Sequence, residues 1–402
     1  MSDDDFSNET QPLVQMPTAR KGRGAVSNLQ GRYEMQARER FDDGWLNDSC
    51  GNGSDENGDH LFNEDGSNNT APPTWKTYVT EEKAKSILTR NASPDIPFSV
   101  SLNPYRGCEH GCIYCFARPT HSYLGLSPGL DFESRIFAKI NAPELLRQEL
   151  AKFSYVAQPI ALGVNTDAYQ PCEREYQLTR RVLEVLHECE HPVGLITKSS
   201  LIERDIDLLS AMAAKRQAAV AITITTLDPA IARTLEPRAA APVRRLRTIR
   251  TLTDAGIPVS VSIAPVIPFI TEPDLERVLA AVAEAGAISA HYIVLRLPWE
   301  VSPLFQQWLQ THFPDRAQRV MNHVREMRGG KDYDANFGTR MRGEGIWADL
   351  IRQRFEKAAK RLGLTGHSHR FHALDASRFR RPLHIPAQAK SNGKACDQQD
   401  LF

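Results

Sequence analysis

Short apolar runs alternate with longer amphipathic stretches between residues 77 and 300, and each kind of segment predicts a different element. The apolar runs, several of them rich in β-branched residues, predict six strands at residues 98–102, 159–165, 193–197, 218–223, 258–263 and 290–295. The amphipathic stretches predict helices at residues 143–152, 173–189, 203–215, 243–255 and 271–285, with a further short helix at 81–88. Strands that alternate with helices form βαβ units and a parallel sheet. Six such units predict an α/β fold, a partial (β/α)6 barrel with its active groups at the C-terminal ends of the strands.

The pattern changes on both sides of this predicted core at 77–300. Beyond it the strand signal stops, and helices are predicted at residues 302–310, 317–327 and 345–362. We therefore expect a basic helical C-terminal region at 301–376 and a disordered tail at 377–402. Residues 1–72 are acidic, rich in Asp, Asn, Gly and Ser, and too poor in apolar side chains to offset the entropy of ordering. They predict a disordered N-terminal region, within which residues 21–25 and 32–45 could dock on the core.

Three cysteines stand close together directly after the first predicted strand. Cys108, Cys112 and Cys115 are separated by three residues and then by two, and a glycine precedes each of the first two. Three thiolates on one short loop can hold three corners of a [4Fe–4S] cluster, which usually takes four, so one iron would stay open to a small chelating molecule. A zinc site usually has a second pair of ligands, and no second half with that spacing follows. A disulfide is disfavoured by the odd number of cysteines, seven.

This motif carries a resemblance to a known family. The spacing Cys-x-x-x-Cys-x-x-Cys, with Tyr114 before the last cysteine, resembles the signature of radical S-adenosylmethionine (SAM) enzymes. The wider text, Asn-Pro-Tyr-Arg-Gly-Cys at 103–108 through Arg-Pro-Thr-His at 118–121, is similar to the spore photoproduct lyase-related branch, the DNA repair photolyase-like proteins. The resemblance covers residues 78–364. It implies a partial barrel in which the open iron binds SAM, and an electron from the cluster cleaves SAM to a 5′-deoxyadenosyl radical.

Polar residues at the strand ends are the candidates for holding SAM. Thr166 and Asp167 follow the second strand and could accept hydrogen bonds from the SAM ammonium group. Lys198 follows the third strand and could pair with the SAM carboxylate, and Thr223 ends the fourth. The alternative is that these residues are ordinary strand-end caps, because polar residues gather at strand ends in any fold. The resemblance also implies that Tyr114 lies near the adenine of SAM.

Two departures from the spore photoproduct lyase pattern bear on the reaction. Those enzymes, as the resemblance implies, carry a hydrogen-donating cysteine where this chain has Val164, and a tyrosine where it has Phe116. Repair of the spore photoproduct itself is therefore not predicted. Cys172 lies at the active end of the second strand and is a candidate for an alternative hydrogen donor. The competing interpretation is a small buried apolar residue, the usual role of such a cysteine.

Charge and the chain end suggest partners. Residues 1–72 carry 14 acidic against 6 basic side chains, whereas the remaining 330 carry 43 basic and 35 acidic ones. A basic folded part is compatible with DNA or another nucleic acid as partner, and also with an ordinary solvated surface. The last residues, Gln-Gln-Asp-Leu-Phe at 398–402, resemble the peptide that bacterial proteins insert into the sliding clamp, with Leu401 and Phe402 as apolar anchors and Gln398 as a hydrogen-bonding group.

The sequence contains no apolar run of about 18 residues and no signal peptide at its start, so no membrane contact and a cytoplasmic setting are predicted. The leading hypothesis is a radical SAM enzyme that cleaves SAM, receives its electron from a donor such as flavodoxin or ferredoxin, and acts on a substrate that is not assigned, with nucleic acid as the favoured class. One rival is a non-catalytic iron–sulfur protein that senses redox state or binds nucleic acid. Another is a radical SAM enzyme that acts on a protein or a small molecule.

Overall fold

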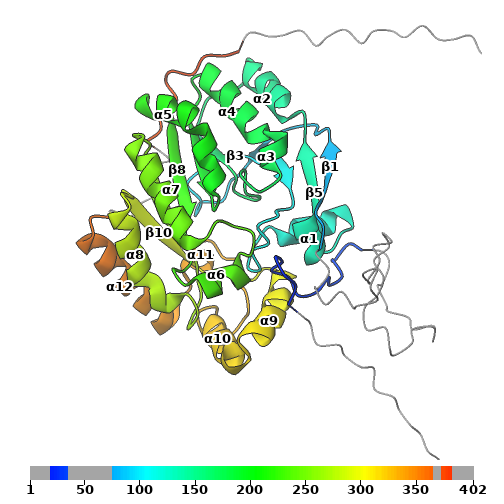
Figure 1. The fold of residues 1–402 in the computed structure, drawn as a ribbon, viewed down its shortest axis with the longest axis vertical. Helices are drawn as coiled ribbons and strands as arrows, with labels where there is room; N and C mark the ends of the chain where they lie inside the picture. Colours follow the sequence, from blue (N-terminus) through cyan, green and yellow to red (C-terminus); the bar gives the residue numbers. More distant parts are fainter. Residues whose placement is uncertain (1–18, 35–74, 365–372, 383–402) are drawn as a thin grey trace, which may run out of the picture.

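The core of the protein is one large, mostly parallel β-sheet. The computed structural model describes residues 19–34, 75–364 and 373–382 (Figure 1). Across the sheet the strands run in the order β10, β9, β8, β7, β6, β3 and β2. From β2 to β10 in chain order these strands span Leu88–Arg90, Val100–Leu102, Ile160–Leu162, Val193–Thr197, Ala218–Thr223, Val259–Val266 and Ser289–Val294. All neighbours pair in parallel except β2, which is antiparallel to β3 at the edge.

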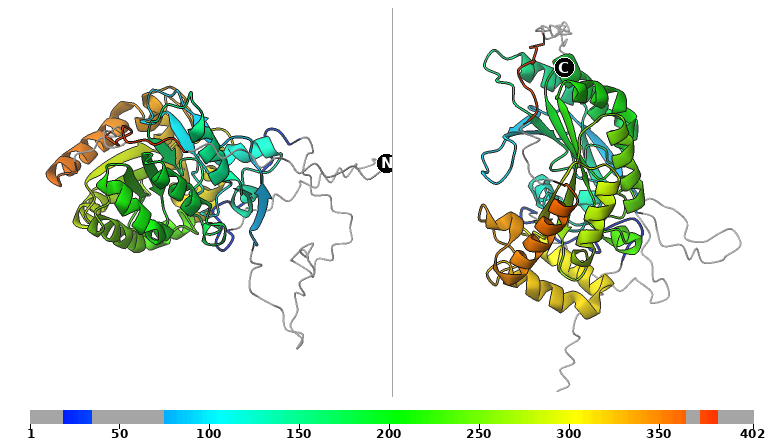
Figure 2. Two further views of the ribbon diagram at one scale, coloured as in Figure 1. Left: turned by 90° about the horizontal axis from the view of Figure 1, so that it is seen from above. Right: turned by 90° about the vertical axis from the view of Figure 1, so that its left-hand side faces the viewer.

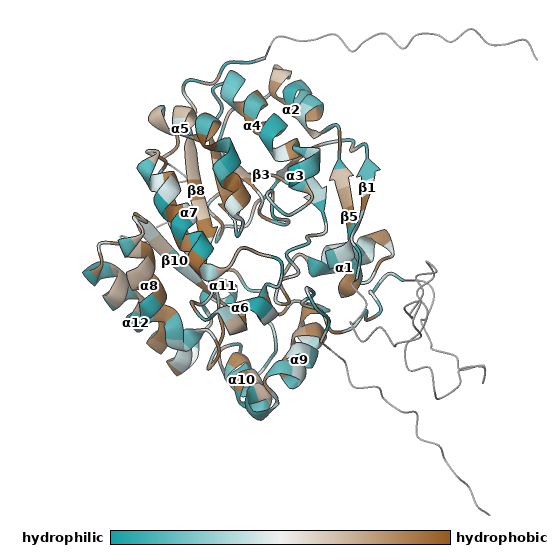
Figure 3. Ribbon diagram, viewed as in Figure 1, coloured by the Kyte–Doolittle hydropathy of each residue, from teal (hydrophilic) through white to brown (hydrophobic). Residues whose placement is uncertain are grey.

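Helices that connect the parallel strands cover one face of the sheet. This layer holds α2, α4, α5, α7 and α8, which span Ala142–Ala151, Leu178–Glu188, Ile206–Ala214, Pro242–Asp254 and Leu275–Glu284. Two short helices, α3 at Glu173–Tyr176 and α6 at Pro229–Leu235, pack in smaller apolar clusters outside it. Alternate strand residues such as Val220 and Val261 pack with the helices of the layer in one continuous apolar core. Figure 2 shows the sheet from the side with helices along it, and Figure 3 shows that β8 is mainly apolar whereas the helices around it carry mixed residues. The arrangement confirms the partial (β/α)6 barrel and all six predicted strands.

A second, three-stranded sheet corrects one prediction. Strand β1, Tyr78–Glu82, pairs in parallel with β5, Arg135–Lys139, and β5 pairs on its other side with β4, Tyr105–Arg106. The helix predicted at 81–88 is therefore wrong, because the stretch begins within β1 and ends where β2 starts. The aromatic and β-branched residues of β1 suit an extended strand, and pairing with β5 outweighs the weak helical pattern.

One predicted helix is divided. The stretch predicted as a single helix at 173–189 forms α3 and α4, and Gln177 between them adopts a left-handed conformation with φ 49°. The side chain of Glu173 is fully buried and accepts hydrogen bonds from the backbone amide of Thr179 at 3.1 and 3.0 Å. An acceptor in this place satisfies an amide that the first turn of α4 leaves unpaired, so it stabilises the break. Four short helical segments were not predicted: η1 at Arg118–Leu124, α1 at Leu130–Ser134, α6 at Pro229–Leu235 and α11 at Thr339–Arg342. The 3₁₀ segments η2 at Ser200–Asp205 and η3 at Glu272–Asp274 lead into α5 and α8 and overlap the helices predicted at 203–215 and 271–285.

The C-terminal region is helical, as predicted. Helices α9 to α12 span Val301–His312, Pro314–Glu326, Thr339–Arg342 and Gly345–Arg361. Helix α12 packs against α8 and β10 and so closes the outer face of the last strand. Within the described ranges, no helix is both long enough and apolar enough to cross a membrane.

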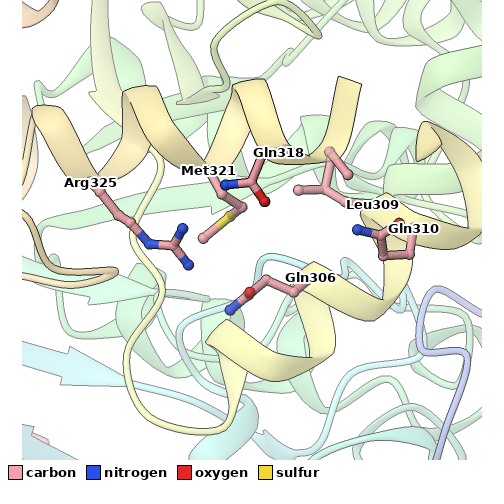
Figure 4. A pocket seen from close by; sticks show the side chains of 7 residues that line it. Gln306, Leu309, Gln310, Gln318, Met321 and Arg325 are labelled. Atoms are coloured by element: carbon pink, nitrogen blue, oxygen red, sulfur yellow. The ribbon is translucent and has the colours of Figure 1, made fainter. Parts of the chain in front are cut away.

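A small pocket lies between α9 and α10 (Figure 4). Its volume is about 40 Å³, and its lining residues are Gln306, Leu309, Gln310, Ala317, Gln318, Met321 and Arg325. A space of this size holds little more than a water molecule or two. None of its lining residues belongs to the strand ends or the cysteine motif, so it is not a candidate for the reaction site.

Residues 373–382 lie along the body of the protein, although the sequence placed residues from 377 onward in a disordered tail. The backbone amide of Asp375 donates to the carbonyl of Arg216 at 2.8 Å, and that of Arg380 donates to the carbonyl of Cys189 at 2.8 Å. The Phe379 ring packs edge-on against His191, with 5.3 Å between the ring centroids. The predicted clamp-binding peptide at 398–402 falls outside the described residues.

The buried His191 predicts a loss of stability in mild acid. Its Nδ1 donates to the Pro192 carbonyl at 3.0 Å, its Nε2 lies 2.8 Å from the Tyr155 hydroxyl, and burial lowers its pKa to about 4. Below pH 6.5 the unfolded chain therefore binds a proton that the folded chain excludes, so the free energy of unfolding should fall as the pH falls. For this residue we expect a loss of about 2 kcal/mol between pH 7 and pH 5.

Urea unfolding of the metal-free protein at both pH values checks this prediction. The variant His191→Gln should show a pH dependence that is smaller by this amount, because glutamine does not titrate. An identical pH dependence in both proteins would contradict the assignment.

Candidate functional site

The three cysteines lie on a tightly folded loop, residues 107–116, which we call the cysteine loop. It follows β4, beyond the C-terminal end of β3. Gly107 and Gly111 adopt φ values of 75° and 65°, a left-handed conformation that glycine reaches without steric cost. A Cβ atom on Gly111 would also lie 2.7 Å from a carboxylate oxygen of Glu133. The loop therefore requires glycine at both positions, for conformation and for space.

The three thiols lie close together in a largely buried part of the loop. Cys108 and Cys112 are each 7% exposed, and Cys115 is partly exposed. Burial raises the pKa of Cys108, and the nearby Asp167, Cys112 and Cys115 raise it further. Burial likewise raises the pKa of Cys112 to about 12, although the neighbouring Lys198 opposes the shift. Without a metal the protonated thiols are therefore favoured over thiolates. A metal centre would supply the positive charge that thiolates need in this buried place.

The donor set fits a cluster better than one ion. Among residues 19–34, 75–364 and 373–382, no group of three or more His, Cys, Asp or Glu side chains is arranged around a single metal ion. A [4Fe–4S] cluster makes a different demand, because each thiolate binds its own iron. Three cysteines on one short loop, near enough to shift one another's pKa, can each bind a separate iron.

A fully buried arginine organises the cysteine loop from behind. Arg118 donates to the carbonyls of Cys112 at 2.9 Å, Gly111 at 3.0 Å and Gly129 at 2.9 Å. Its guanidinium also forms an ion pair with the fully buried Glu133. A planar group with five donors in fixed directions can satisfy several carbonyls at once, which lysine cannot do. Arg118 therefore fixes the backbone between the first two cysteines.

Residues 19–34, which we call the N-terminal belt, pack directly on this loop. The backbone amides of Gly24 and Ala25 donate to the Glu133 carboxylate at 3.0 and 2.8 Å, and Arg23 donates to the Glu133 carbonyl at 2.6 Å. Ala25 is fully buried in an apolar cluster that includes Cys112. The structure thus confirms that residues 21–25 dock on the core, and it shows that they wall off one side of the cysteine loop.

The contact between belt and loop predicts a strong effect of one added methyl group. A Cβ atom on Gly24 would lie 1.9 Å from the carbonyl oxygen of Gly111, and backbone cannot move aside as a flexible side chain can. We expect Gly24→Ala to detach the belt, to expose its Arg20 and Arg23 to trypsin, and to lower stability by about 1–3 kcal/mol, the usual cost of overpacking.

Limited trypsin digestion with mass spectrometry measures this exposure. The control is Gly22→Ala, which adds a methyl group where no atom lies within 4 Å and so introduces only left-handed strain. Equal cleavage of both variants would show that the close approach at Gly24 does not hold the belt.

Asp167 lies at the strand ends as predicted, and the protein itself already surrounds its carboxylate. It accepts hydrogen bonds from the Thr197 hydroxyl at 2.7 Å and from the backbone amide of Lys198 at 2.8 Å, and His110 Nδ1 lies 3.3 Å away. Burial alone would raise the pKa of Asp167, but the nearby His110 and these hydrogen bonds hold it well below its usual range. Asp167 therefore ties β6 to β7, and contact with the SAM ammonium would be an additional task. Thr166 is buried, and its hydroxyl donates to the Tyr105 carbonyl at 3.0 Å.

Lys198, Tyr114 and Thr223 meet at a buried charged group that sequence reasoning missed. The Glu236 carboxylate accepts from the Tyr114 hydroxyl and forms an ion pair with Arg245. Arg245 also donates to the Thr223 carbonyl at 2.9 Å, and Lys198 Nζ lies 5.8 Å from the centre of the Tyr114 ring. Burial would raise the pKa of Glu236, but the two cations hold it below its ordinary value. One cation in this group, Lys198, lies beside Cys112 and so brings positive charge to the thiols.

Cys172 lies next to Glu109 of the cysteine loop. It is 9% exposed and packs in a small apolar cluster with Tyr105 and Ile136. Its backbone amide donates to the Glu109 side chain at 2.7 Å, and burial raises its pKa, with Glu109 and Glu173 adding to the effect. This position suits the small apolar residue of the competing interpretation, and a hydrogen-donor role for Cys172 stays a prediction.

Comparisons with known proteins agree with this site. The profile described as Radical SAM superfamily matches residues 102–282, which contain all three cysteines and Lys198. An uncharacterized protein of Mycobacterium tuberculosis is 36% identical over 243 residues, which cover 60% of this chain and 71% of that protein. An uncharacterized protein of Methanocaldococcus jannaschii is 25% identical over 247 residues, covering 61% and 88%. With its partial barrel and cysteine loop, the chain belongs to the radical SAM superfamily.

The solved structures with a similar fold include spore photoproduct lyase. A cysteine-to-serine mutant of that enzyme superposes with a TM-score of 0.52 at 13% identity, over 71% of this chain and 79% of that one. A spore photoproduct lyase complexed with dinucleoside spore photoproduct gives 0.51 at 12% identity over the same shares. A further mutant with bound AdoMet and the same dinucleoside gives 0.50 at 12% identity, again over 71% and 79%. This similarity establishes the fold that the two proteins share.

Proposed function

We propose that this protein is a radical SAM enzyme whose [4Fe–4S] cluster is held by Cys108, Cys112 and Cys115. The observation that carries the proposal is three neighbouring cysteines, two of them largely buried, on a loop that Arg118 holds beyond the C-terminal end of a strand of a partial barrel. In barrels of this kind the active groups lie at that end. When bound, the cluster supplies the electron that cleaves SAM to a 5′-deoxyadenosyl radical.

The chain's own residues hold and shield that chemistry. Arg118 and the N-terminal belt fix the cysteine loop and keep water from one side of it. Lys198 retains its proton: burial would lower its pKa, but the nearby Cys112 and Glu236 raise it above the ordinary value. A fixed positive charge beside the loop suits the carboxylate of SAM, and the buried Glu236 fixes the Tyr114 hydroxyl. Thr166, Asp167 and Thr223 complete the proposed SAM site at the neighbouring strand ends.

For the substrate we propose nucleic acid. The support is the sequence resemblance, the basic excess after residue 72, and similarity of fold to an enzyme solved with a dinucleoside lesion. Val164 and Phe116 depart from the spore photoproduct lyase pattern, so we propose a different nucleic-acid substrate or reaction. A cytoplasmic setting, reduction by a protein such as flavodoxin or ferredoxin, and a clamp contact through 398–402 stay predictions.

Anaerobic reconstitution tests the proposal. The full chain is loaded with iron and sulfide, reduced with dithionite and mixed with SAM, and 5′-deoxyadenosine is measured by chromatography. Formation of this product is the expected result. A cluster that loads and is reduced while SAM stays intact would instead support the rival, a redox-sensing or nucleic-acid-binding protein without catalysis. Nucleic acid that binds no more tightly than its salt-dependent background would favour a protein or small-molecule substrate.

A further inference from the structure

Side chains on the last three strands face two different environments. On β8, β9 and β10, alternate residues such as Val220, Val261 and Tyr292 belong to the core that packs on the helices. Tyr292, for example, packs on Phe355 of α12, with 4.8 Å between ring centroids. Because successive strand residues point to opposite faces, their neighbours face the inside of the partial barrel. This inner face carries mostly small residues: Ala219 and Ala221 on β8, Ser260, Ser262 and Ala264 on β9, and His291 and Ile293 on β10.

The register of the strands places one inner residue from each strand at the same level. His291 pairs with Ser262, and Ser262 pairs with Thr223. On the next strand Thr197 pairs with Ile222, so Lys198 stands level with Thr223. A polar row therefore crosses four strands from Lys198, beside the cysteine loop, to His291 on the last strand of the sheet. We call it the polar row.

His291 is the exposed member of this row. Thr223 and Ser262 are 3% and 6% exposed, whereas the side chain of His291 is open to solvent. Burial nevertheless lowers the pKa of His291 to about 4, because protein surrounds the residue even though water can reach it. By strand alternation His291 lies on the inner, concave face of the partial barrel. Within the described ranges His291 has no hydrogen-bond partner, so at neutral pH its ring offers one free donor and one free acceptor.

We propose that His291 is a substrate-recognition residue that hydrogen-bonds the edge of an unpaired nucleobase inside the barrel. The proposal rests on the function proposed above and deepens it. A neutral imidazole matches an uncharged edge that carries both donors and acceptors, whereas a phosphate would call for a cation. The inner residues of β8 and β9 are small, most of them are partly exposed, and the partly exposed Ile293 offers an apolar side chain two positions from His291. Lys198 stands at the other end of the polar row. The proposed SAM site therefore lies at the same level of the barrel as His291.

Chemical modification tests the proposal without the cluster. Diethyl pyrocarbonate acylates neutral, accessible imidazoles, so His291 in the metal-free full chain should react at pH 7, as read from its peptide by mass spectrometry. Thymidylyl-thymidine should slow this reaction at least about threefold, and inorganic phosphate at the same concentration should not. Protection by phosphate alone, or no protection by the dinucleotide, would overturn the proposal.

Binding to the reconstituted protein with SAM gives a second measurement. Isothermal titration with thymidylyl-thymidine should give a dissociation constant about 10-fold higher for His291→Ala, since the polar edge of the base would be left without a partner. His291→Gln, which keeps a donor and an acceptor, should lie within about threefold of the native protein. The control His312→Ala, on α9, should bind as the native protein does. If His291→Ala binds thymidylyl-thymidine as tightly as the native protein and His312→Ala do, the role of His291 is refuted.

The same preparation separates this inference from the proposed function. If the native protein forms 5′-deoxyadenosine but His291→Ala binds the dinucleotide normally, only the recognition role of His291 is wrong. If the native protein forms no 5′-deoxyadenosine although its cluster is reduced, the proposed function is wrong, whatever the binding measurement shows for His291.

Discussion

Replacing Cys112 by alanine should reduce 5′-deoxyadenosine formation by more than about 100-fold, to the level seen without iron. Residues that merely support a metal ligand already cost about 10- to 100-fold in affinity or activity when they are replaced. A direct ligand should cost more, because one iron of the cluster would lose its thiolate. Chromatography of the reconstituted protein with dithionite and SAM measures the product. Iron content and the visible absorbance of the cluster should fall in parallel.

The matched control is Cys189→Ala. Cys189 is also buried, at 1% exposure, but it ends α4 in the main apolar core. Its replacement should leave the cluster and product formation within about twofold of the native protein, with only the small loss of stability that a missing sulfur atom causes. Product formation that survives in Cys112→Ala would refute the assignment of the three ligands.

Replacing Arg118 by leucine should lower the free energy of unfolding by about 3–5 kcal/mol, the cost of leaving a buried charge without its partner. Arg118 is fully buried, and its loss would leave the Glu133 carboxylate without its cationic partner and would remove a donor from several loop carbonyls. Urea unfolding of the metal-free protein measures the difference. We also expect the variant to retain less iron after reconstitution, because the backbone between Cys108 and Cys112 would no longer be fixed.

A nearby exposed arginine provides the control. Arg135 pairs with Asp131 at 3.6 Å, and its side chain is 60% exposed, so Arg135→Leu should cost less than about 1 kcal/mol. Combining Arg118→Leu with Glu133→Leu should recover part of the lost stability, since both buried charges are then removed. The recovery should be incomplete, because Glu133 also accepts from the amides of Gly24 and Ala25. Equal stability of the two single arginine variants would contradict the role given to Arg118.

Local signals explain how much of the fold the sequence predicts. The six main strands are short apolar runs bounded by turns, so each can be recognised without knowing its partners. Strand β4 has two residues, and β5 includes arginine and lysine at its ends, so neither carries such a pattern. Their pairing depends on contacts between distant segments, as in β1 with β5, which no local pattern contains.

The candidate site divides in the same way. The cysteine spacing and the strand-end positions of Asp167 and Lys198 follow from the order of residues alone. The buried groups behind them do not, because a glutamate such as Glu236 looks like any surface glutamate until its partner is known. Tyr114, which donates to it, is 122 positions away in the chain. His291 is predictable only in part. The alternation of residues along a strand predicts which face of the sheet it lies on. That it pairs with Ser262 depends on the register between β9 and β10, which the local sequence does not contain.

The N-terminal belt has a consequence for what counts as the independent folding unit. The stretch that matches the superfamily begins at residue 102, whereas the belt that supplies two amides to Glu133 and walls the cysteine loop comes from residues 19–34. A fragment trimmed to the matched stretch would expose the apolar side of Cys112 to water and leave a buried carboxylate short of donors. The matched stretch is therefore shorter than the unit that packs around the cysteine loop, and a fragment made for expression or engineering should begin at or before Arg23.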